Sequence, residues 1–251
     1  MSGTQGAAVA SGRRHVINNR SGRPRASMTF PQLLIEGYRT FLDGRLRREQ
    51  DRYRELGETG QSPEIMVIGC CDSRVSPEVI FDARPGELFV VRNVANIVPP
   101  YAPDGQAHGV SAALEFGVAA LKVKHIVVLG HARCGGVKAF AEDAEPLTPG
   151  DFIGKWMRLM APAADKVGPR GGLSWPEYLT RLEQANVANS MANLLTFPRL
   201  RQFVEREQIA IHGAYFGVAT GRLSVRDADT GEFVAIDSGH AVGVGTSASQ
   251  S

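Results

Sequence analysis

The chain has 251 residues, of which 43% are hydrophobic, and its formal net charge is only +2. This length fits one large domain with enough apolar residues to close a core. The small charge gives no argument for nucleic acid or a membrane surface as partner, and no apolar run approaches the ~20 residues that a spanning helix needs. The cysteines are few and odd in number, which argues against a disulfide framework and for a reducing compartment. We therefore take the cytoplasm as the expected location.

The two ends of the chain differ from its middle. Residues 1–27 contain five arginines and no acidic residue, which predicts a disordered basic arm. An organelle import leader is the alternative, because transit peptides are also basic and poor in acidic residues. Residues 238–251, rich in Gly, Ser and Ala, predict a flexible tail. A single domain is therefore expected over residues 28–237.

A helix is predicted directly after the basic arm. Pro31 suits the first turn of a helix, and apolar side chains follow at helical spacing. Arg45–Glu55 then continues as a highly charged segment. We expect this N-terminal helical arm to pack on its own subunit or on a partner. Its apolar stripe consists of Leu33, Leu34, Tyr38, Phe41 and Leu42.

From Ser62 onward, predicted strands and helices alternate. This order indicates an α/β fold with a central, mostly parallel β-sheet flanked by helices. We expect about four core strands plus an edge strand, with a turn at Thr220-Gly221 near the sheet edge. The strands are expected at Ile65–Ile68, Leu88–Val91, Ile126–Leu129, within Ile209–Val218, and at Leu223–Val225.

The intervening segments predict helices of different lengths. Residues 143–175 are rich in Pro and Gly, so we expect a loop with one short helix near Phe152–Met160. The other helices are expected at Pro77–Phe81, at Val110–Leu121, from Val137 to Glu142, and across Pro176–Arg206 with a break near Pro198.

Two predicted strands end in residues that can bind a metal. The first runs into Cys70, and the third delivers His131 and Cys134, after which Gly135 and Gly136 allow a tight turn. Ligands bind at the carboxyl ends of strands in open parallel sheets, so these side chains are expected to converge. Two thiolates and an imidazole suit zinc, and three protein ligands with one open position are typical of a catalytic site.

Asp72 and Arg74 follow the first strand and would lie beside the metal. Two ionised cysteines and a neutral histidine cancel the charge of zinc, so a bound water can lose a proton near neutral pH. Thiolates donate more charge than imidazoles, so nearby hydrogen-bond donors must compensate. Arg74 can hold Asp72 in a bidentate pair, and Asp72 can then accept a hydrogen bond from zinc-bound hydroxide. Released from Arg74, the carboxylate could bind zinc as a fourth ligand, which would be an on/off switch.

The patterns Cys70-x-Asp72-Ser73-Arg74 and His131-x-x-Cys134-Gly135-Gly136 together resemble those of the β-class carbonic anhydrases. The similarity covers about residues 30–235 and includes Arg92–Asn96 and Asn193–Pro198. It implies a Zn²⁺ enzyme that interconverts carbon dioxide and bicarbonate. It also implies an obligate dimer, alone or as a dimer of dimers, whose N-terminal arm clasps the partner and whose active site lies at the dimer interface.

Further residues match the plant-like branch of that family. Gln61 matches its active-site glutamine, which orients a substrate oxygen, while Phe89 and Val94 match its apolar substrate pocket. The backbone N–H of Gly135 would be a further donor. Phe116 stands where that branch often has tyrosine, which removes a hydroxyl from any proton relay.

The other, bacterial branch has a Trp and a Tyr that build an inhibitory bicarbonate site. Val67 and, by approximate alignment, Phe216 replace them here, although Arg92 remains. We therefore predict that Asp72 stays paired with Arg74 near neutral pH.

The resemblance predicts that zinc-bound hydroxide attacks carbon dioxide held against Phe89 and Val94, while Gln61 and Asp72 orient the reacting atoms. The products are bicarbonate and a proton, which must leave for buffer. His108 and His125 are candidates for its carrier by residue type only. His212, inside a predicted strand, is expected in the core.

Other functions remain open at this point. A related hydrolase could use the same zinc site on carbon disulfide or carbonyl sulfide, because tunnel shape and assembly are not visible in motifs. A non-catalytic zinc-stabilised oligomer, or a thiol redox protein working through Cys70 and Cys71, are further alternatives. Against the redox function, the chain has no Cys-x-x-Cys pair. Cys71 is expected to pack rather than ligate, because side chains alternate along an extended chain.

Overall fold

The computed structural model of the protein describes residues 30–236, so the predicted basic arm over 1–27 and the predicted tail over 238–251 lie outside the described residues. The chain forms two compact units, the first ending at Asp51 and the second beginning at Arg52. The single domain expected over 28–237 remains a prediction.

The N-terminal segment is helical, as the sequence predicts, and its last helix runs on into the second unit. Helix α1 (Gln32–Phe41) continues through the π-helical turn η1 (Leu42–Leu46) into α2 (Arg47–Thr59). Pro31 lies at the N-cap rather than in the first turn, so the helix begins one residue later than expected. No residue of α1 is buried, and Leu33 is 78% exposed. Leu33, Leu34 and Tyr38 of the expected apolar stripe are therefore exposed in this chain, whereas Phe41 and Leu42 are half-buried.

The second unit contains a six-stranded sheet in the order β2-β1-β3-β4-β5-β6. The four strands from β2 to β4 are parallel, and β5 and β6 add to β4 in antiparallel fashion. The expected mostly parallel sheet with four core strands is confirmed, whereas β6 was not expected. The strands are β1 (Ile65–Cys70), β2 (Leu88–Asn93), β3 (His125–His131), β4 (Ala210–Gly217), β5 (Arg222–Arg226) and β6 (Phe233–Ala235).

The helices alternate with the parallel strands. One element differs from expectation: α7 lies in the segment that the sequence predicts as loop. Pro162 is in its first turn, where a missing N–H costs nothing, so this proline starts a helix rather than breaking one. The elements are α3 (Pro77–Ile80), η2 (Val94–Asn96), α4 (Gly109–Glu115), η3 (Phe116–Leu121), α5 (Gly135–Ala141), α6 (Phe152–Met157), η4 (Arg158–Met160), α7 (Ala161–Val167), α8 (Trp175–Leu194) and α9 (Pro198–Glu205).

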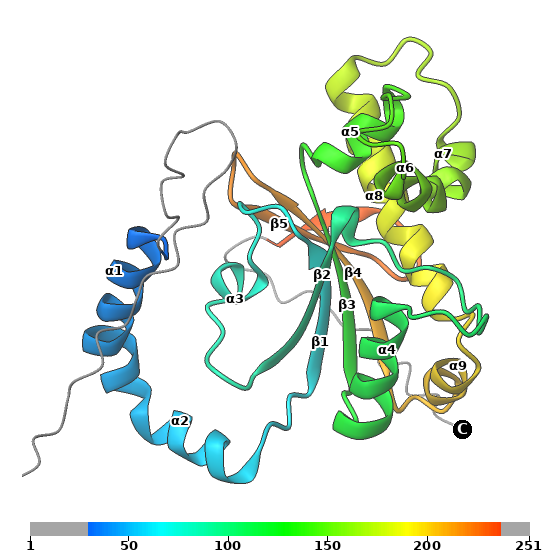
Figure 1. Cartoon of the computed structure of the whole chain (residues 1–251). Helices are drawn as coiled ribbons and strands as arrows, with labels where there is room; N and C mark the ends of the chain where they lie inside the picture. The colour runs from blue at the N-terminus through cyan, green and yellow to red at the C-terminus, as the bar shows by residue number, and fades with distance from the viewer. Residues whose placement is uncertain (1–29, 237–251) are drawn as a thin grey trace, which may run out of the picture. The chain divides into compact units, whose positions relative to one another are not determined.

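The two faces of the sheet are covered differently. Met66 and Ile68 point to one face, where they pack with Leu114 of α4 and Val187 of α8 in the largest core cluster. Figure 1 shows α4, α8 and α9 on one side of the sheet and α3 on the other. The second face carries Val67 with several only partly buried apolar side chains. At its edge lies a cavity of about 490 Å³.

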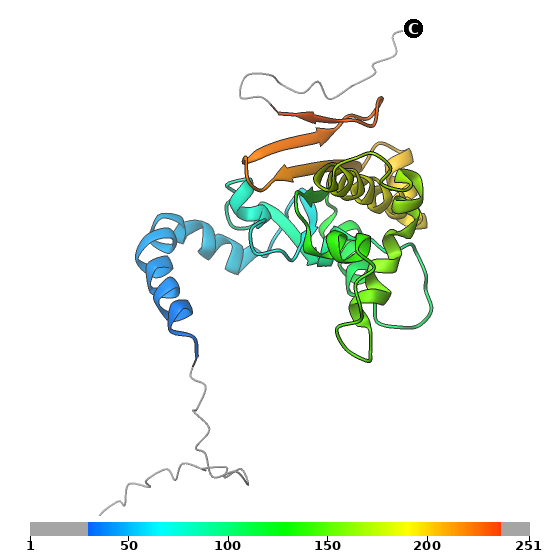
Figure 2. The ribbon, with the colours of Figure 1, turned by 90° about the horizontal axis from the view of Figure 1, so that it is seen from above.

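Helix α8 packs unusually close to the sheet. A Cβ added at Gly130 of β3 would lie 2.5 Å from Val187, and one at Gly213 of β4 would lie 2.7 Å from Met191. The two glycines therefore let the helix approach. Figures 1 and 2 both show α8 alongside β4. The helix begins with a capping box, in which Ser174 and Glu177 satisfy each other's backbone N–H groups.

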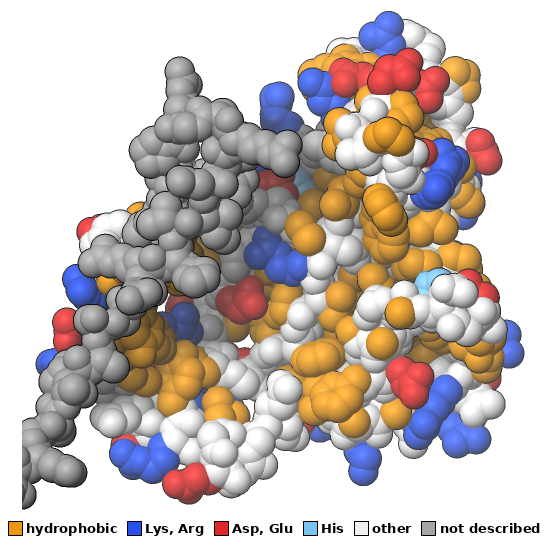
Figure 3. All heavy atoms as spheres, in the orientation of Figure 1, with side chains coloured by type: hydrophobic (Ala, Val, Ile, Leu, Met, Phe, Trp, Pro, Cys, Tyr) orange, Lys and Arg blue, Asp and Glu red, His pale blue; other side chains and the backbone are white. Residues whose placement is uncertain are grey.

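Charges are mixed on the surface. On the face shown in Figure 3, Lys and Arg side chains are interspersed with Asp and Glu, as expected from the small net charge. No described helix is long and apolar enough to cross a membrane.

Candidate metal centre

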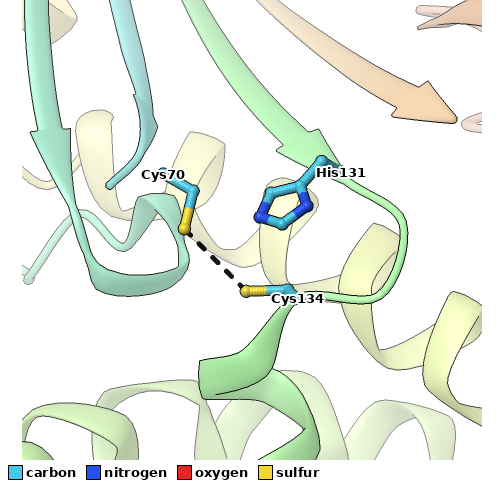
Figure 4. Close-up of side chains that lie close together, drawn as sticks. All are labelled: Cys70, His131 and Cys134. Atoms are coloured by element: carbon cyan, nitrogen blue, oxygen red, sulfur yellow. Dashed lines mark hydrogen bonds between the residues drawn. The ribbon is translucent and has the colours of Figure 1, made fainter. Parts of the chain in front are cut away.

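Three buried side chains converge at the carboxyl ends of β1 and β3. They are Cys70, His131 and Cys134, and their ligand atoms all lie within 4.8 Å of one another. The two sulfur atoms are 4.0 Å apart, and the imidazole of His131 lies beside them (Figure 4). The convergence that the strand ends predict is confirmed.

Parallel pairing brings the two segments together. Gly69 of β1 is opposite Leu129 of β3, so both strands end at the same edge of the sheet. The chain then turns through Arg133, which has a left-handed φ of 58°. Cys134 follows as the N-cap residue of α5. Its sulfur consequently lies beside the side chains of Cys70 and His131, which end β1 and β3.

The hydrogen bonding of His131 selects the tautomer that binds metal. Its Nδ1 lies 3.0 Å from the carbonyl oxygen of Ala132, to which an Nδ1–H donates. Nε2 then carries the free lone pair, yet it is buried without a hydrogen-bond partner. A buried polar atom without a partner costs about 1–3 kcal/mol. A metal ion at this position would remove that cost, so the orphaned nitrogen fits a metal ligand.

The electrostatics of the two thiols favour one thiolate. A hydrogen bond from Cys134 lowers the pKa of Cys70 to about 4 despite burial, with His131 and the Ala95 N–H lowering it further. The same hydrogen bond, together with burial, raises the pKa of Cys134. Burial alone would lower the pKa of His131, but the nearby Cys70 raises it. Cys70 is thus prepared as a thiolate, the form that binds metal.

The distances fit zinc. Tetrahedral Zn–S bonds of ~2.3 Å place two sulfurs about 3.8 Å apart. The 4.0 Å between Cys70 and Cys134 needs almost no rearrangement to reach that value. Sulfur and imidazole donors suit zinc better than the hard cations magnesium or calcium.

Arg74 holds Asp72 beside the cluster, as the sequence predicts. The carboxylate accepts two hydrogen bonds from the guanidinium and one of 3.0 Å from the Arg74 backbone N–H. The Arg74 side chain holds the pKa of Asp72 well below its usual range. Arg74 also donates to the carbonyl oxygen of Arg133, 3.1 Å away, which ties the pair to the turn before Cys134.

Arg92 supports the same loop from β2, a contact that sequence reasoning missed. Its Nε donates to the carbonyl oxygen of Cys70 at 2.9 Å, and its Nη2 to that of Asp72 at 2.7 Å. Parallel pairing places Arg92 opposite Gly69. Its position in the Arg92–Asn96 motif was the only signal in the sequence.

Glu183 of α8 is a second residue that sequence reasoning missed. One carboxylate oxygen accepts the Cys134 backbone N–H at 2.9 Å, and the other accepts the Tyr215 hydroxyl at 2.6 Å. Burial raises the pKa of Glu183, although both hydrogen bonds oppose that shift. A carboxylate at a core-facing position of a long helix was the available signal, because such groups are almost never buried without partners.

Comparisons with known proteins now decide the family. A family model described as carbonic anhydrase matches residues 65–223. The chain is 36% identical to beta carbonic anhydrase 3 of Arabidopsis thaliana over 197 residues, which is 77% of this chain and 75% of that protein. The chain belongs to the β-carbonic anhydrase family.

Solved β-carbonic anhydrases share the fold. The structure of the β-carbonic anhydrase CcaA superposes with a TM-score of 0.76 at 30% identity, covering 82% of this chain and 92% of that one. One of two tetrameric β-carbonic anhydrases from Sordaria macrospora gives 0.66 at 29% identity, covering 77% and 94%. The architecture that positions the site is therefore a known β-carbonic anhydrase architecture.

Not every predicted site residue of this β-carbonic anhydrase chain meets the cluster. Val94 lies at it, because a Cβ on Gly136 would come within 2.8 Å of the Val94 side chain. Gly135 directly follows Cys134 in the first turn of α5. Phe89 lies away from the cluster. It is opposite Met66 in β1, about 13 Å along the strand from Cys70. Its ring packs on Phe116 instead, with centroids 5.9 Å apart.

Gln61 also lies away from the cluster of its own chain. It precedes β1, whose first residue, Ile65, lies about 16 Å along the strand from Cys70. Gln61 is exposed. Gln61 and Phe89 therefore lie outside the metal cluster of their own chain, and their expected roles stay predictions.

Cys71 and the candidate proton carriers also differ from simple expectation. Cys71 is exposed, so the expectation that it packs is wrong. His125 and His131 mark the two ends of β3, about 20 Å apart, so His125 cannot serve the metal cluster of its own chain. His212 is only half-buried and lies 3.2 Å from His125. His108 pairs with Asp104 at 2.7 Å.

Proposed function

We propose that this protein catalyses the reversible hydration of carbon dioxide to bicarbonate and a proton, with Zn²⁺ held by Cys70, His131 and Cys134. The observation that carries the proposal is the buried, unpaired Nε2 of His131 facing two sulfurs that are already at ligand spacing. Family membership supplies the reaction. A bound zinc would supply Lewis acidity, which makes hydroxide available from water near neutral pH.

Asp72 and Arg74 would set the geometry at the open position of the metal. The closed pair keeps the carboxylate ionised and turned toward Arg74, where it remains an acceptor. Asp72 would accept a hydrogen bond from the group that binds at the open position and fix its orientation. This arrangement supports a paired, active state near neutral pH.

The substrate would lie between an apolar side chain and a backbone donor. Val94 supplies the apolar contact, which suits an uncharged molecule such as carbon dioxide. The backbone N–H of Gly135 would donate to a substrate oxygen. Both groups belong to the chain that holds the metal ligands.

Gln61 and Phe89 would come from a partner chain. Two features support a homodimer, alone or as part of a tetramer. Leu33, Leu34 and Tyr38 of α1 are exposed, and the second face of the sheet is only partly covered. Parallel sheets are normally buried on both faces, so a second copy would complete this one. The solved relatives from Sordaria macrospora are tetrameric.

Location and alternative substrates belong to the same proposal. The three free cysteines support a reducing compartment such as the cytoplasm. Imaging of the full chain, compared with a chain lacking residues 1–29, would reveal organelle import. Carbonyl sulfide and carbon disulfide should be assayed beside carbon dioxide, because the metal ligands alone do not select among the three.

A stopped-flow assay of carbon dioxide hydration tests the proposal. Cys70→Ser should lose both zinc and activity, whereas Cys71→Ser, at an exposed neighbouring thiol, should keep both. Zinc content is measured on the same samples. Stoichiometric zinc without hydration activity in the wild type would refute the enzyme and leave a zinc-stabilised scaffold.

A further inference from the structure

Helix α8 presents polar side chains to the core, where an amphipathic helix normally presents apolar ones. Asn186, Ser190 and Asn193 follow one face of the helix, and each contacts the backbone of the segment 94–98. Asn186 and Ser190 are fully buried. This segment connects β2 to the rest of the chain and passes directly beside Cys70.

The segment has a conformation that its residues do not favour. Ala95 and Asn96 have positive φ angles of 63° and 46°. The left-handed region is unfavourable for a residue with a Cβ, more so for alanine than for asparagine. Three consecutive carbonyl groups are held by side chains from elsewhere: Val94 by Trp156 at 2.8 Å, Ala95 by Asn186 at 2.7 Å and Asn96 by Ser190 at 3.1 Å.

This conformation aims one backbone N–H at a metal ligand. The Ala95 N–H donates to the sulfur of Cys70, 3.3 Å away. The Cys134 sulfur has separate donors, since the backbone N–H groups of Gly136 and Val137 at the start of α5 donate hydrogen bonds to it. A hydrogen bond to a ligating thiolate reduces the charge that the sulfur donates, and partners of this kind tune the bound metal.

We propose that Asn186 is a positioning residue for the metal site: by holding the Ala95 carbonyl, it keeps the Ala95 N–H on the Cys70 sulfur and makes the bound metal a stronger electrophile. This inference rests on the proposed zinc site and identifies a donor that offsets its two thiolates. Asn186 acts through Ala95 and touches neither metal nor substrate.

The hydrogen bonds of Asn186 favour this role over simple packing. Its Oδ1 is buried without a partner, which is an energetic cost that leucine at the same position would avoid. Its Nδ2 nevertheless makes one short bond, and that bond fixes the residue whose N–H reaches Cys70. The benefit of asparagine at position 186 is therefore this single donor.

Asn193 offers a matched control on the same helix. It lies two turns further along and donates to the Val98 carbonyl at 2.8 Å. Val98 belongs to a different core cluster from Cys70 and Cys134. N186L and N193L each replace an asparagine donor by an apolar side chain of similar size. Urea unfolding measures the structural cost of each variant separately, because Asn186 is buried whereas Asn193 is only half-buried.

The full-length protein is loaded with Co²⁺, whose thiolate charge-transfer absorption reports the electron density on sulfur. We expect this band to move to longer wavelength in N186L and to stay in place in N193L. Zinc affinity at neutral pH, measured by chelator competition, should fall about ten-fold in N186L only. If the band and affinity of N186L match those of N193L, the inference is overturned.

A second pair of variants guards against misfolding. Should N186L fail to fold, N186A and N193A are compared in the same way, since alanine cannot donate and adds no bulk. A wild type that binds cobalt through thiolates but does not hydrate carbon dioxide would refute the proposed reaction alone. The spectral comparison would still decide the role of Asn186.

Discussion

Arg74 donates a hydrogen bond to each carboxylate oxygen of Asp72, at 2.9 Å for Nε···Oδ1 and 2.6 Å for Nη2···Oδ2. The parallel two-point contact needs a planar guanidinium, because a lysine ammonium acts as a point charge. The carboxylate is therefore held toward Arg74 by geometry as well as by charge.

Arg74→Lys should release Asp72 from this orientation. We expect activity to fall about 10- to 100-fold while zinc is retained, since the metal ligands are untouched. X-ray absorption at the zinc edge should show a protein oxygen in place of solvent if the freed carboxylate binds. Arg74→Lys combined with Asp72→Ala is the control. An unchanged activity in Arg74→Lys would show that the pairing is irrelevant to catalysis.

Mixed dimers test the origin of Gln61. In the proposed dimer, Gln61→Ala keeps its own metal ligands, while Cys70→Ser keeps its own Gln61. A heterodimer of the two inactive chains contains one site with intact ligands and an intact partner glutamine. Co-expressed chains should therefore recover activity that neither variant shows alone. Simple averaging of the two separate activities would argue that Gln61 serves its own chain or no site at all.

Gly130→Ala should loosen the contact between α8 and the sheet. The new methyl would lie 2.5 Å from Val187, and overpacking of this kind costs about 1–3 kcal/mol. The urea midpoint should fall accordingly. Gly172→Ala, where a Cβ meets nothing within 4 Å, serves as the control and should change stability by less than about 0.5 kcal/mol. Equal midpoints for both variants would contradict the close approach.

The half-buried His212 should make stability depend on pH. Burial, with a smaller contribution from His125, lowers its pKa below 6.5. The folded chain then binds fewer protons than the unfolded chain at low pH. The stability that neutral His212 contributes is therefore fully present above the pKa that this histidine has in the unfolded chain. It is lost as the pH falls from about 6.5 toward the folded value.

The urea midpoint of the wild type should therefore drop between about pH 7.5 and about pH 5.5. In His212→Asn the drop should be smaller, whereas His108→Asn, at an exposed position, should retain it. A pH dependence identical in wild type and His212→Asn would exclude His212 as its source.

The metal ligands could be predicted from the sequence because each lies at the end of a buried strand or shortly after it. Residues at the carboxyl ends of neighbouring parallel strands must meet at one edge of the sheet. Cys70 and His131 obey that rule, and Cys134 is only a short turn away. The pairing of Asp72 with Arg74 is equally local, since only Ser73 separates them.

The remaining features depend on contacts that have no local signal. Glu183 reaches Cys134 across 49 positions, and Asn186 reaches Ala95 across 91, so neither bond leaves a pattern in a sequence window. Strand β6 has only three residues, too few for a period of two to show. Helix α7 was hidden because its Pro162 is read as a helix breaker unless the starting residue of the helix is known.

The two cysteine ligands are 64 positions apart along the chain. A single ion held by both sulfurs would join β1 to the start of α5 as a covalent staple does, and a staple of that span restricts the unfolded chain by about 4 kcal/mol. Unlike a disulfide, this cross-link forms without an oxidant and is broken when a chelator removes the metal. The availability of the metal would therefore determine the stability of the folded enzyme as well as its activity.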